Sequence, residues 1–354
     1  MSRIYLDYAS LTPIDKGVMK VMKKYSKGEY TNPSSLYSSG VKAKRAIDEA
    51  KTNIAKLIHA HPDELVFTSG GTEANDLVFR MCQGKKVMIS AIEHSSIVEN
   101  ENAILIPVDK NGIVDLDFIK ENLNSEISLV SIMYVNNEIG SIQPISEIAK
   151  IIRDFNKKNN TNILFHTDAS QAVSLMPIFV EKLSVDLMTF DGHKIYGPRG
   201  IGMLYVKRGI EIKRRGTENV PAIMGFSYAL SINEKIKEKE NKRIAEIKSF
   251  LYKGLLEINP QIKINGSLEN STPHILNVSI PNIDNEFFLL QLDVKGIEVS
   301  TKSACLRDED ESYVLKAICA DSKNSIRFSF GRGTSKSDLK YVIKVITGIL
   351  RSSI

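Results

Sequence analysis

The segment VDLMTFDGHKIYGPRGIGMLYV, residues 185–206, indicates the class of fold more directly than any other part of the chain. An apolar run ends at Phe190, the residues Asp-Gly-His-Lys follow, and a turn rich in Gly and Pro leads into a second apolar run. Apolar runs without alternation are typical of strands buried on both faces of a sheet. Lys194 thus lies in a Gly-rich loop at a strand end, where a partly desolvated lysine suits Schiff-base chemistry. Taken alone, a lysine in such a loop is more often an ordinary surface residue.

Strand-like and helix-like segments alternate through the first two thirds of the chain. Apolar and β-branched runs predict strands at 86–90, 104–108, 127–133, 162–166, 185–190 and 200–206. Apolar residues at helical spacing predict helices at 41–58, 72–81, 115–122 and 146–156. This alternation predicts an α/β domain with a mostly parallel central sheet flanked by helices.

The pattern changes near residue 231. The charged run NEKIKEKENKRIAEIKSFL, residues 233–251, has apolar residues at helical spacing and predicts a long solvated connecting helix. Strands near 275–280 and 326–330 and a last helix at 337–350 follow it. We therefore expect a large domain at 13–232 and a smaller α+β domain formed by 1–12 and 233–354.

The composition is that of an ordinary globular protein. The 354 residues are 42% hydrophobic and 25% charged, and a chain of this length exceeds one simple core. No run approaches the roughly 20 apolar residues of a membrane span, and MSRIYLDYAS lacks the apolar core of a signal peptide. The net charge of +5 is spread along the chain and gives no direct indication of nucleic-acid binding. We expect a cytoplasmic protein.

Three cysteines, Cys82, Cys305 and Cys319, are too few and too irregularly spaced for a disulfide framework or a zinc site, so we expect no metal. Cys82 and Cys319 fall in helical patterns. Because free cysteines are among the most buried residues, we expect both in the core.

Polar residues follow several of the predicted strands. Asp168 comes just after the run NILFH, where a buried carboxylate could pair with a pyridinium nitrogen. Ser69–Thr72, with the sequence SGGT, precedes a helix whose N-terminal N–H groups could bind a phosphate. His94 and Asn137 follow the runs at 86–90 and 127–133. The carboxyl edge of an open α/β sheet is where such folds bind ligands.

Six segments, which include several of the residues above, follow one another in the order seen in a known enzyme family: VFTSGGTEAND, VSIMYVNNEIG, HTDASQAV, DGHKIYGPRGIG, RRGTEN and SAC…SYVLKA. From IYLDYASLTP to SIRFSFGRGT, nearly the whole chain resembles the NifS-like cysteine desulfurases, class V members of the fold type I pyridoxal-phosphate (PLP) enzymes. The resemblance implies PLP as cofactor and L-cysteine as substrate.

The resemblance also implies a role for each matching residue. Lys194 would hold PLP as a Schiff base and transfer protons, Asp168 would pair with the pyridine nitrogen, and His94 would stack over the ring. The other implied contacts are those of Gln171 and Asn137 with the ring hydroxyl, of Gly71, Thr72 and His193 with the phosphate, and of Arg327, Asn32 and Asn137 with the substrate. Thr217 would reach the phosphate from a second subunit, which implies a homodimer with shared active sites.

Cys305 stands at the position of the family's persulfide cysteine, in the polar segment STKSACLRDEDESYVLK. The resemblance implies that the thiolate of Cys305 takes the sulfur of L-cysteine, so that L-alanine is released. A protein acceptor in Fe–S cluster assembly or thiolation would then receive the sulfur. The sequence does not identify that acceptor.

Five departures from the family pattern surround the phosphate and the subunit boundary. Asp191 replaces a Ser that helps bind the phosphate, and its carboxylate would repel a phosphate about 4 Å away by about 1–4 kcal/mol. Either Asp191 turns away or the phosphate is held less tightly. The family's GGGQE-type segment before Thr217 is absent, Lys302 replaces a Gly, Tyr37 replaces a His, and the opening turn at 10–13 reads Ser-Leu-Thr-Pro.

Three functions stay open on these residues. An active cysteine desulfurase is favoured by the retention of Lys194, Asp168, His94, Arg327 and Cys305. A PLP lyase or transaminase acting on another amino acid would share the fold. A catalytically weakened member serving as a binding or scaffold subunit is suggested by the changes around the phosphate.

Overall fold

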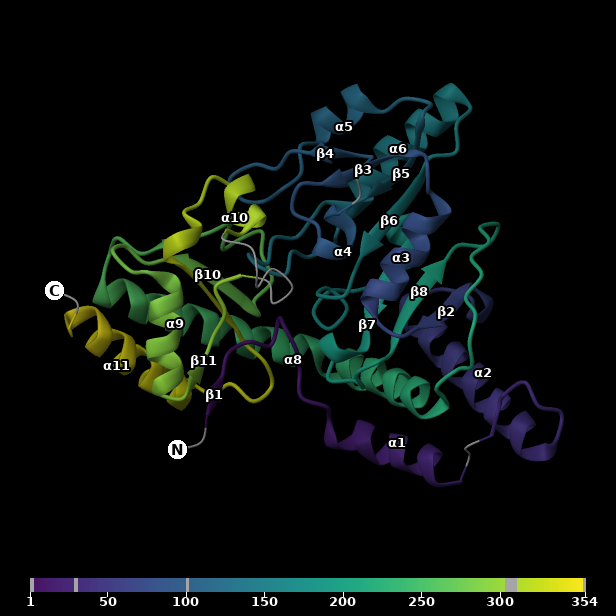
Figure 1. Cartoon of the computed structure of the whole chain (residues 1–354), viewed down its shortest axis with the longest axis horizontal. Helices are drawn as coiled ribbons and strands as arrows, with labels where there is room; N and C mark the ends of the chain where they lie inside the picture. Colours follow the sequence, from purple (N-terminus) through teal and green to yellow (C-terminus); the bar gives the residue numbers. More distant parts are fainter. Residues whose placement is uncertain (1–2, 29–30, 100–101, 303–310, 353–354) are drawn as a thin grey trace.

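In the computed structural model, seven strands form one sheet in the order β2-β8-β7-β6-β5-β3-β4 (Figure 1). The structure describes residues 3–28, 31–99, 102–302 and 311–352. The strands are β2 (Leu65–Thr68), β3 (Lys86–Ser90), β4 (Ala103–Ile106), β5 (Ile127–Ser131), β6 (Leu164–Asp168), β7 (Leu187–Asp191) and β8 (Gly202–Val206). All neighbours are parallel except that β8 runs antiparallel to both β7 and β2, so the predicted mostly parallel sheet is confirmed.

Helices cover both faces of this sheet. In β7, Leu187 packs into the hydrophobic cluster beneath α3, whereas Met188 and Phe190 pack into a larger cluster on the other face. The larger cluster includes residues of α2, α6 and the first half of α8. Burial on both faces is why these strands are apolar without alternation.

The helices are α1 (Lys16–Gly28), α2 (Ser38–Ile58), α3 (Gly71–Met81), α4 (Ser95–Val98), α5 (Leu116–Asn122), α6 (Ile145–Asn159), α7 (Val180–Leu183), α8 (Val220–Ile258), α9 (Asn285–Val294), α10 (Tyr313–Ala317) and α11 (Lys336–Ser352). Short 3-10 turns occur at η1 (Pro62–Glu64), η2 (Gly192–Lys194) and η4 (Ser322–Asn324). No helix of the described residues is long and apolar enough to cross a lipid bilayer.

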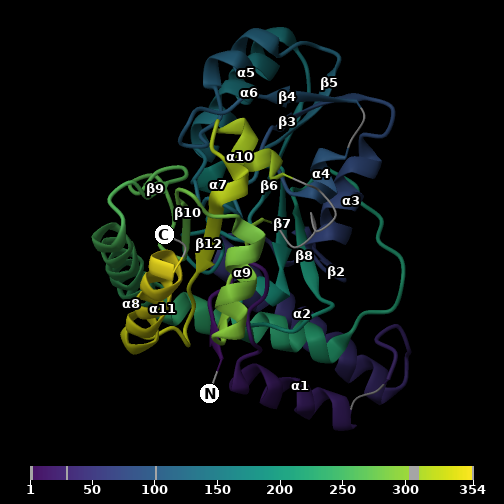
Figure 2. The same ribbon diagram turned by 60° about the vertical axis from the view of Figure 1, so that its left-hand side comes forward.

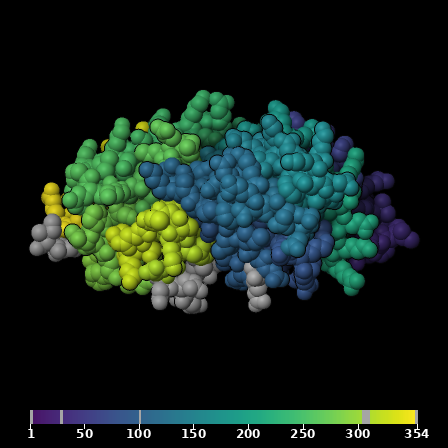
Figure 3. Space-filling model, turned by 90° about the horizontal axis from the view of Figure 1, so that it is seen from above, coloured from purple at the N-terminus to yellow at the C-terminus, as the bar shows by residue number. Residues whose placement is uncertain are grey.

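The C-terminal third builds a separate hydrophobic cluster around a small antiparallel sheet. This sheet has the order β12-β10-β9, with bounds β9 (Lys263–Ile264), β10 (Ile275–Ser279) and β12 (Ser325–Ser329). A further strand, β11 (Ile297–Glu298), pairs in parallel with β1 (Ile4–Tyr5), so the N-terminus belongs structurally to this region. Figure 3 shows the green-to-yellow C-terminal residues at one end of the molecule and the blue-to-teal residues at the other.

The 39-residue helix α8 joins the two regions. Phe226 in its first half belongs to the large cluster, and Leu251 in its second half belongs to the C-terminal one. Figure 2 shows α11 beside this second half, in agreement with their packing. One continuous helix therefore contributes to both hydrophobic clusters.

The predicted elements occur with shifted ends. Strand β6 extends to Asp168 instead of ending at residue 166, and the long connecting helix begins at Val220 instead of near residue 231. Strand β2, helix α1 and helix α9 were not predicted. The four residues of β2 are too few to show a period.

The prediction for one cysteine is wrong. Cys82 is buried, as expected, but Cys319 is exposed. Helix α10 ends at Ala317, and Cys319 takes a left-handed conformation with φ of 57° as the chain turns away from the helix. The helical pattern of the sequence continues beyond the point at which the helix ends.

Gly202, in β8, packs against the backbone of the turn that precedes α3. A Cβ atom on Gly202 would lie 2.5 Å from the carbonyl carbon of Gly70. We expect Gly202→Ala to lower the free energy of unfolding by about 1–3 kcal/mol, because the atoms that the new Cβ would meet belong to the backbone of Gly70 and cannot rotate away. Urea denaturation of the variant checks this.

Gly348, in α11, provides the control because a Cβ there meets no atom within 4 Å. Gly348→Ala should be neutral or stabilising by up to about 1 kcal/mol. A Gly202→Ala variant as stable as the wild type would contradict the close contact.

Candidate active site

The loops that follow β3, β5, β6 and β7 meet at the carboxyl edge of the large sheet and line one cavity. Nine predicted site residues line it: Gly71, Thr72, His94, Asn137, Asp168, Gln171, His193, Lys194 and Arg327. Asn32 and Thr217 are not among its lining residues, and Cys305 lies outside the described residues. The predicted gathering of polar residues at this edge is present in the structure.

Lys194 lies in η2, directly after β7. Its Nζ donates hydrogen bonds to the carbonyl oxygens of Ala9 (2.8 Å) and Ser10 (2.7 Å). The Thr12 hydroxyl donates to the carbonyl oxygen of His193 (2.7 Å). The N-terminal segment therefore holds both the lysine loop and the lysine amine. Sequence patterns did not indicate these contacts because backbone carbonyls leave no residue signature.

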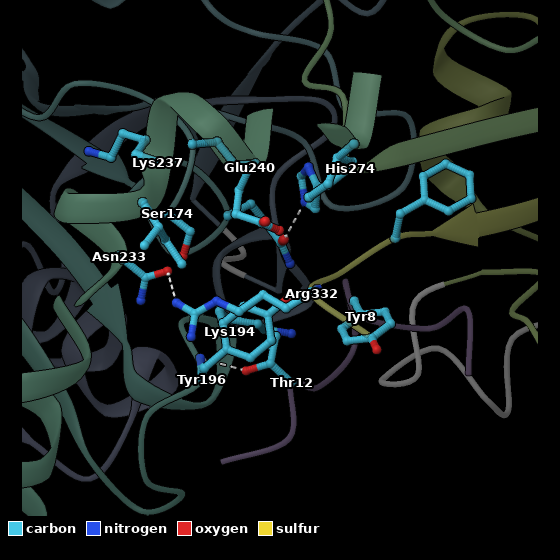
Figure 4. A pocket seen from close by; sticks show the side chains of 15 residues that line it. Tyr8, Thr12, Ser174, Lys194, Tyr196, Asn233, Lys237, Glu240, His274 and Arg332 are labelled. Atoms are coloured by element: carbon cyan, nitrogen blue, oxygen red, sulfur yellow. Dashed lines mark hydrogen bonds between the residues drawn. The ribbon is translucent and has the colours of Figure 1, made fainter. Parts of the chain in front are cut away.

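Lys194 also borders a second, smaller cavity, about 40 Å³ against about 170 Å³ for the first. Figure 4 shows Lys194 in this second cavity beside Thr12, Tyr196 and Arg332. Arg332 donates to Asn233 (2.8 Å) and lies over the Tyr196 ring, with its guanidinium carbon 4.0 Å from the ring centroid. Lys194 thus lies between two cavities.

Asp168 is buried at the end of β6, with an exposed fraction of 7%. Its Oδ1 accepts from the N–H of Ser170 (2.9 Å), and its Oδ2 accepts from Nδ2 of Asn75 (3.0 Å). These contacts fix the carboxylate at the cavity wall, in agreement with pairing to a ring nitrogen. Asn75 was missed in the sequence, although it lies four residues after Gly71 on the same face of α3.

Arg327 is almost completely buried in β12, with an exposed fraction of 1%. Its Nη1 donates to the carbonyl oxygen of Asn137 (2.8 Å), and its Nη2 pairs with Oδ1 of Asp7 (2.7 Å). Its Nε has no hydrogen-bond partner among the described residues. A buried, unsatisfied donor is costly, so this guanidinium is suited to bind an incoming carboxylate.

Gln171 is held by two partners. Its Nε2 donates to the carbonyl oxygen of Ala9 (2.8 Å), and its Oε1 is 3.1 Å from Nε2 of His274. Burial, with the nearby charges of Lys248, Arg327 and Lys194, lowers the pKa of His274 to about 3. His274 is therefore neutral and can donate to the Gln171 amide.

His94 directly precedes α4 and caps its N-terminus. Its Nδ1 accepts from the N–H of Ser96 (3.2 Å), so the helix orients the imidazole. The neighbouring Asn137 is buried at the cavity, with an exposed fraction of 9%. Both positions match the sequence prediction of polar residues after strands.

The N-terminus of α3 binds the carboxylate of Asp191. Asp191 Oδ2 accepts from the N–H of Gly71 (2.7 Å). Its Oδ1 accepts from the N–H of His193 (2.9 Å) and lies 2.5 Å from Nδ1 of the same residue. Burial alone would raise the pKa of Asp191, but His193 and the N–H of Gly71 hold it below its usual value. In this structure Asp191 faces the N-terminus of α3 and does not turn away from it.

The donor set fits PLP at most of its contact points. A lysine amine, a fixed carboxylate at Asp168 and a buried guanidinium at Arg327 border one cavity. These groups suit the carbonyl carbon, the pyridine nitrogen and the carboxylate of an amino-acid substrate. The phosphate end has the helix N-terminus of α3 and His193, together with the carboxylate of Asp191.

A strand-end lysine and a buried carboxylate at the carboxyl edge of a mostly parallel sheet define a fold type I PLP enzyme. The model of the Aminotransferase class-V family matches residues 4–213 and 208–342. The chain therefore belongs to the class V aminotransferase family, whose members depend on PLP.

Relatives named cysteine desulfurase or NifS-like match almost the whole chain. "Cysteine desulfurase IscS" of Dictyoglomus turgidum is 38% identical over an alignment that covers 98% of this chain and 94% of the relative. Among solved structures, the NifS-like protein from Rickettsia africae is 31% identical, covers 99% of both chains and has a TM-score of 0.89. The structure of "SspA in complex with cysteine" is 27% identical, with a TM-score of 0.76, and covers 92% of this chain and 98% of its own.

Glu93, directly before His94, is a buried acid that the sequence did not single out. Its Oε1 accepts from the Ser90 hydroxyl (2.5 Å) and from the N–H of Met133 (2.7 Å), while its Oε2 has no partner among the described residues. Burial raises the pKa of Glu93 to about 8, and the charge of Asp168 acts in the same direction. The acid is therefore mainly protonated at neutral pH.

Glu93 should make the protein less stable as the pH rises. Because its folded-state pKa is raised, its contribution is complete below about 4.5 and is lost as the pH rises to about 8. Relative to the wild type, Glu93→Gln should gain up to about 1.4 kcal/mol of unfolding free energy per pH unit in this window. Urea denaturation at pH 5 and pH 8 measures the difference.

Glu238→Gln serves as the control because Glu238 is exposed on α8 and pairs with Lys242. A constant difference between the wild type and Glu93→Gln at both pH values would show that Glu93 does not titrate in this range.

Proposed function

We propose that this chain is a PLP-dependent cysteine desulfurase, which converts L-cysteine to L-alanine and keeps the sulfur as a persulfide on Cys305. The observation that carries the proposal is the meeting of Lys194, Asp168 and Arg327 at one cavity. The names of the relatives and the cysteine complex of SspA support L-cysteine as the substrate.

Bound PLP supplies an electron sink that makes the Cα proton of an amino acid acidic. Lys194 holds the cofactor covalently and then carries protons, with its amine positioned by the carbonyls of Ala9 and Ser10. Asp168 would pair with the ring nitrogen, and its contacts with Asn75 and Ser170 keep it oriented for that role. His94 would contact the ring.

Gln171 and Asn137 would contact the ring hydroxyl. Gly71, Thr72 and His193 are the phosphate contacts of the same chain. Arg327 would bind the substrate carboxylate, and its Nε, which has no partner among the described residues, is a donor that this carboxylate could satisfy. Asp7, paired with Nη2, keeps the guanidinium plane fixed.

Both flanks of the segment that carries Cys305 are attached beside the cavity. Before it, the backbone of Ser300 pairs with that of Arg327 (2.7 and 3.2 Å). After it, the Ser312 hydroxyl donates to Glu138 (2.6 Å), and the Tyr313 hydroxyl donates to the carbonyl oxygen of Glu93. The chain therefore leaves and returns near the substrate site, which supports Cys305 as the sulfur-accepting thiol.

The atoms of this transfer balance without an external oxidant. The Cβ–S bond of L-cysteine breaks, an S–S bond forms with the Cys305 sulfur, and the two protons of the thiols end on the persulfide and on the methyl group of L-alanine. A protein acceptor of Fe–S cluster assembly or thiolation then receives the sulfur.

The active unit proposed here is a homodimer. Thr217 lies in the irregular connection between β8 and α8 and does not line the cavity of its own chain, which is consistent with a contact to the partner's phosphate. Asn32 lies between α1 and α2, and its role beside the substrate stays a prediction. The large domain is assigned to 13–232 and the small domain to 1–12 and 233–354, in line with the two hydrophobic clusters.

The persulfide assignment is tested with Cys305→Ser. PLP-loaded variant protein should bind cysteine but release less than about 1% of the wild-type sulfide in the presence of dithiothreitol, since the hydroxyl cannot accept the sulfur. Sulfide and alanine are measured together.

Cys319→Ser is the matched control, because Cys319 is an exposed thiol outside the cavity. It should keep full activity, whereas Lys194→Ala should lose both activity and the visible absorption of the lysine-bound cofactor. Unchanged sulfide release by Cys305→Ser would make the assignment of the nucleophile wrong.

Substrate recognition is tested with Arg327→Lys. Lysine keeps the charge but loses the planar fork, so we expect the KM for L-cysteine to rise at least about tenfold while PLP absorption persists. Steady-state kinetics and the absorption spectrum measure the two effects. A variant with an unchanged KM would place the substrate carboxylate elsewhere.

A further inference from the structure

We propose that Asp191 is an internal competitor of the cofactor phosphate: its carboxylate occupies the N-terminus of α3 in the cofactor-free protein and thereby keeps PLP weakly held and exchangeable. The inference rests on the PLP site of the proposed function, and it is independent of the desulfurase reaction and of Cys305.

The carboxylate lies where a phosphate would bind. Gly71 is the first residue of α3, and its N–H is one of the donors that a helix leaves without an internal partner. That N–H donates to Asp191 Oδ2 at 2.7 Å. A Cβ atom on Gly71 would lie 3.2 Å from the same oxygen, so the space that this glycine leaves open is taken by the Asp191 carboxylate.

Asp191 engages a second group of the phosphate site as well. The other carboxylate oxygen lies 2.5 Å from Nδ1 of His193. Of the three phosphate contacts expected within the chain, Gly71 and His193 are therefore both bonded to Asp191, and Thr72 is the third. Arg214, which contacts the first turn of α3, pairs with Glu73 at 3.2 Å. The positive end of the helix and its neighbours are thus largely neutralised by the protein's own acids.

Two opposite effects follow from this contact. A phosphate must displace the carboxylate or share its donors with a like charge, and either route weakens binding. In the absence of cofactor, the same carboxylate caps α3 from β7, a strand far from α3 in sequence, and so stabilises the fold. Removing Asp191 should therefore strengthen PLP binding and weaken the cofactor-free protein.

The test compares PLP with pyridoxal, which forms the same link to lysine but lacks the phosphate. Cofactor-free wild type, Asp191→Ser and Asp191→Asn are titrated with each compound, and the dissociation constants are read from absorption. We expect the Kd for PLP to fall at least about tenfold in Asp191→Ser, and the Kd for pyridoxal to change less than about threefold. Inorganic phosphate should compete with PLP in Asp191→Ser at concentrations that leave the wild type unaffected.

Asp76→Asn is the control for charge alone, because Asp76 lies on the same helix but is paired with Arg80 outside the cavity. It should bind PLP as the wild type does. The melting temperature of cofactor-free Asp191→Ser should fall below that of the wild type, whereas Asp191→Asn, which keeps an oxygen for the Gly71 N–H, should lose less. If Asp191→Ser does not fold, Asp191→Asn carries the comparison, with a smaller gain for PLP and none for pyridoxal.

An unchanged Kd for PLP in both variants would overturn the proposal, and so would an equal gain for pyridoxal, since the effect would then act through Lys194. Failure of the proposed function is distinguishable. A wild type that binds PLP but releases no sulfide from cysteine would refute the desulfurase reaction and leave the competition of Asp191 with phosphate intact.

Discussion

The backbone carbonyl of Ala9 accepts hydrogen bonds from both Lys194 and Gln171, and the rest of the site depends on this contact. The segment that carries Ala9 leaves strand β1, which pairs with the C-terminal region, and then crosses to the end of the large sheet. Asp7 in the same segment pairs with Arg327. One short stretch of backbone thus connects the group that holds the cofactor with the group proposed to hold the substrate.

Around this contact, burial removes charge from several ionisable groups. Desolvation lowers the pKa of His166 to about 4 and that of His274 to about 3, and it raises the pKa of Glu93 to about 8. His166 lies between the hydroxyls of Ser131 (2.8 Å) and Thr189 (3.0 Å) in the sheet interior. Neutral groups cost less desolvation energy than charged ones, so burial of these side chains favours their neutral forms.

At the end of the cavity expected to hold the phosphate, the protein keeps a charged side chain. There the protein places a carboxylate, Asp191, on the helix N-terminus and pairs it with His193. The Asp191 carboxylate satisfies the N–H of Gly71 at the start of α3 without a ligand, which favours a stable cofactor-free fold. The Gly-rich segment that the family resemblance predicts before Thr217 is absent from this chain.

The sequence by itself determined the central sheet, because runs such as those of β3 and β7 are apolar on both faces and only a doubly covered strand tolerates that pattern. Polar residues after strands also predicted Lys194, Asp168, His94, Asn137 and the turn before α3 as cavity residues, since parallel strands end at one edge. Gln171, His193 and Arg327 were predicted by the family resemblance alone. The contacts of Asn75, Asp7 and the Ala9 carbonyl were decided by tertiary structure, because each joins segments far apart in sequence, and backbone groups are not encoded by residue type. The orientation of Asp191 was also decided by tertiary structure, because from sequence its carboxylate could face either solvent or α3. The close packing of β7, β8 and α3 around Gly71 and Gly202 directs it toward the N-terminus of α3.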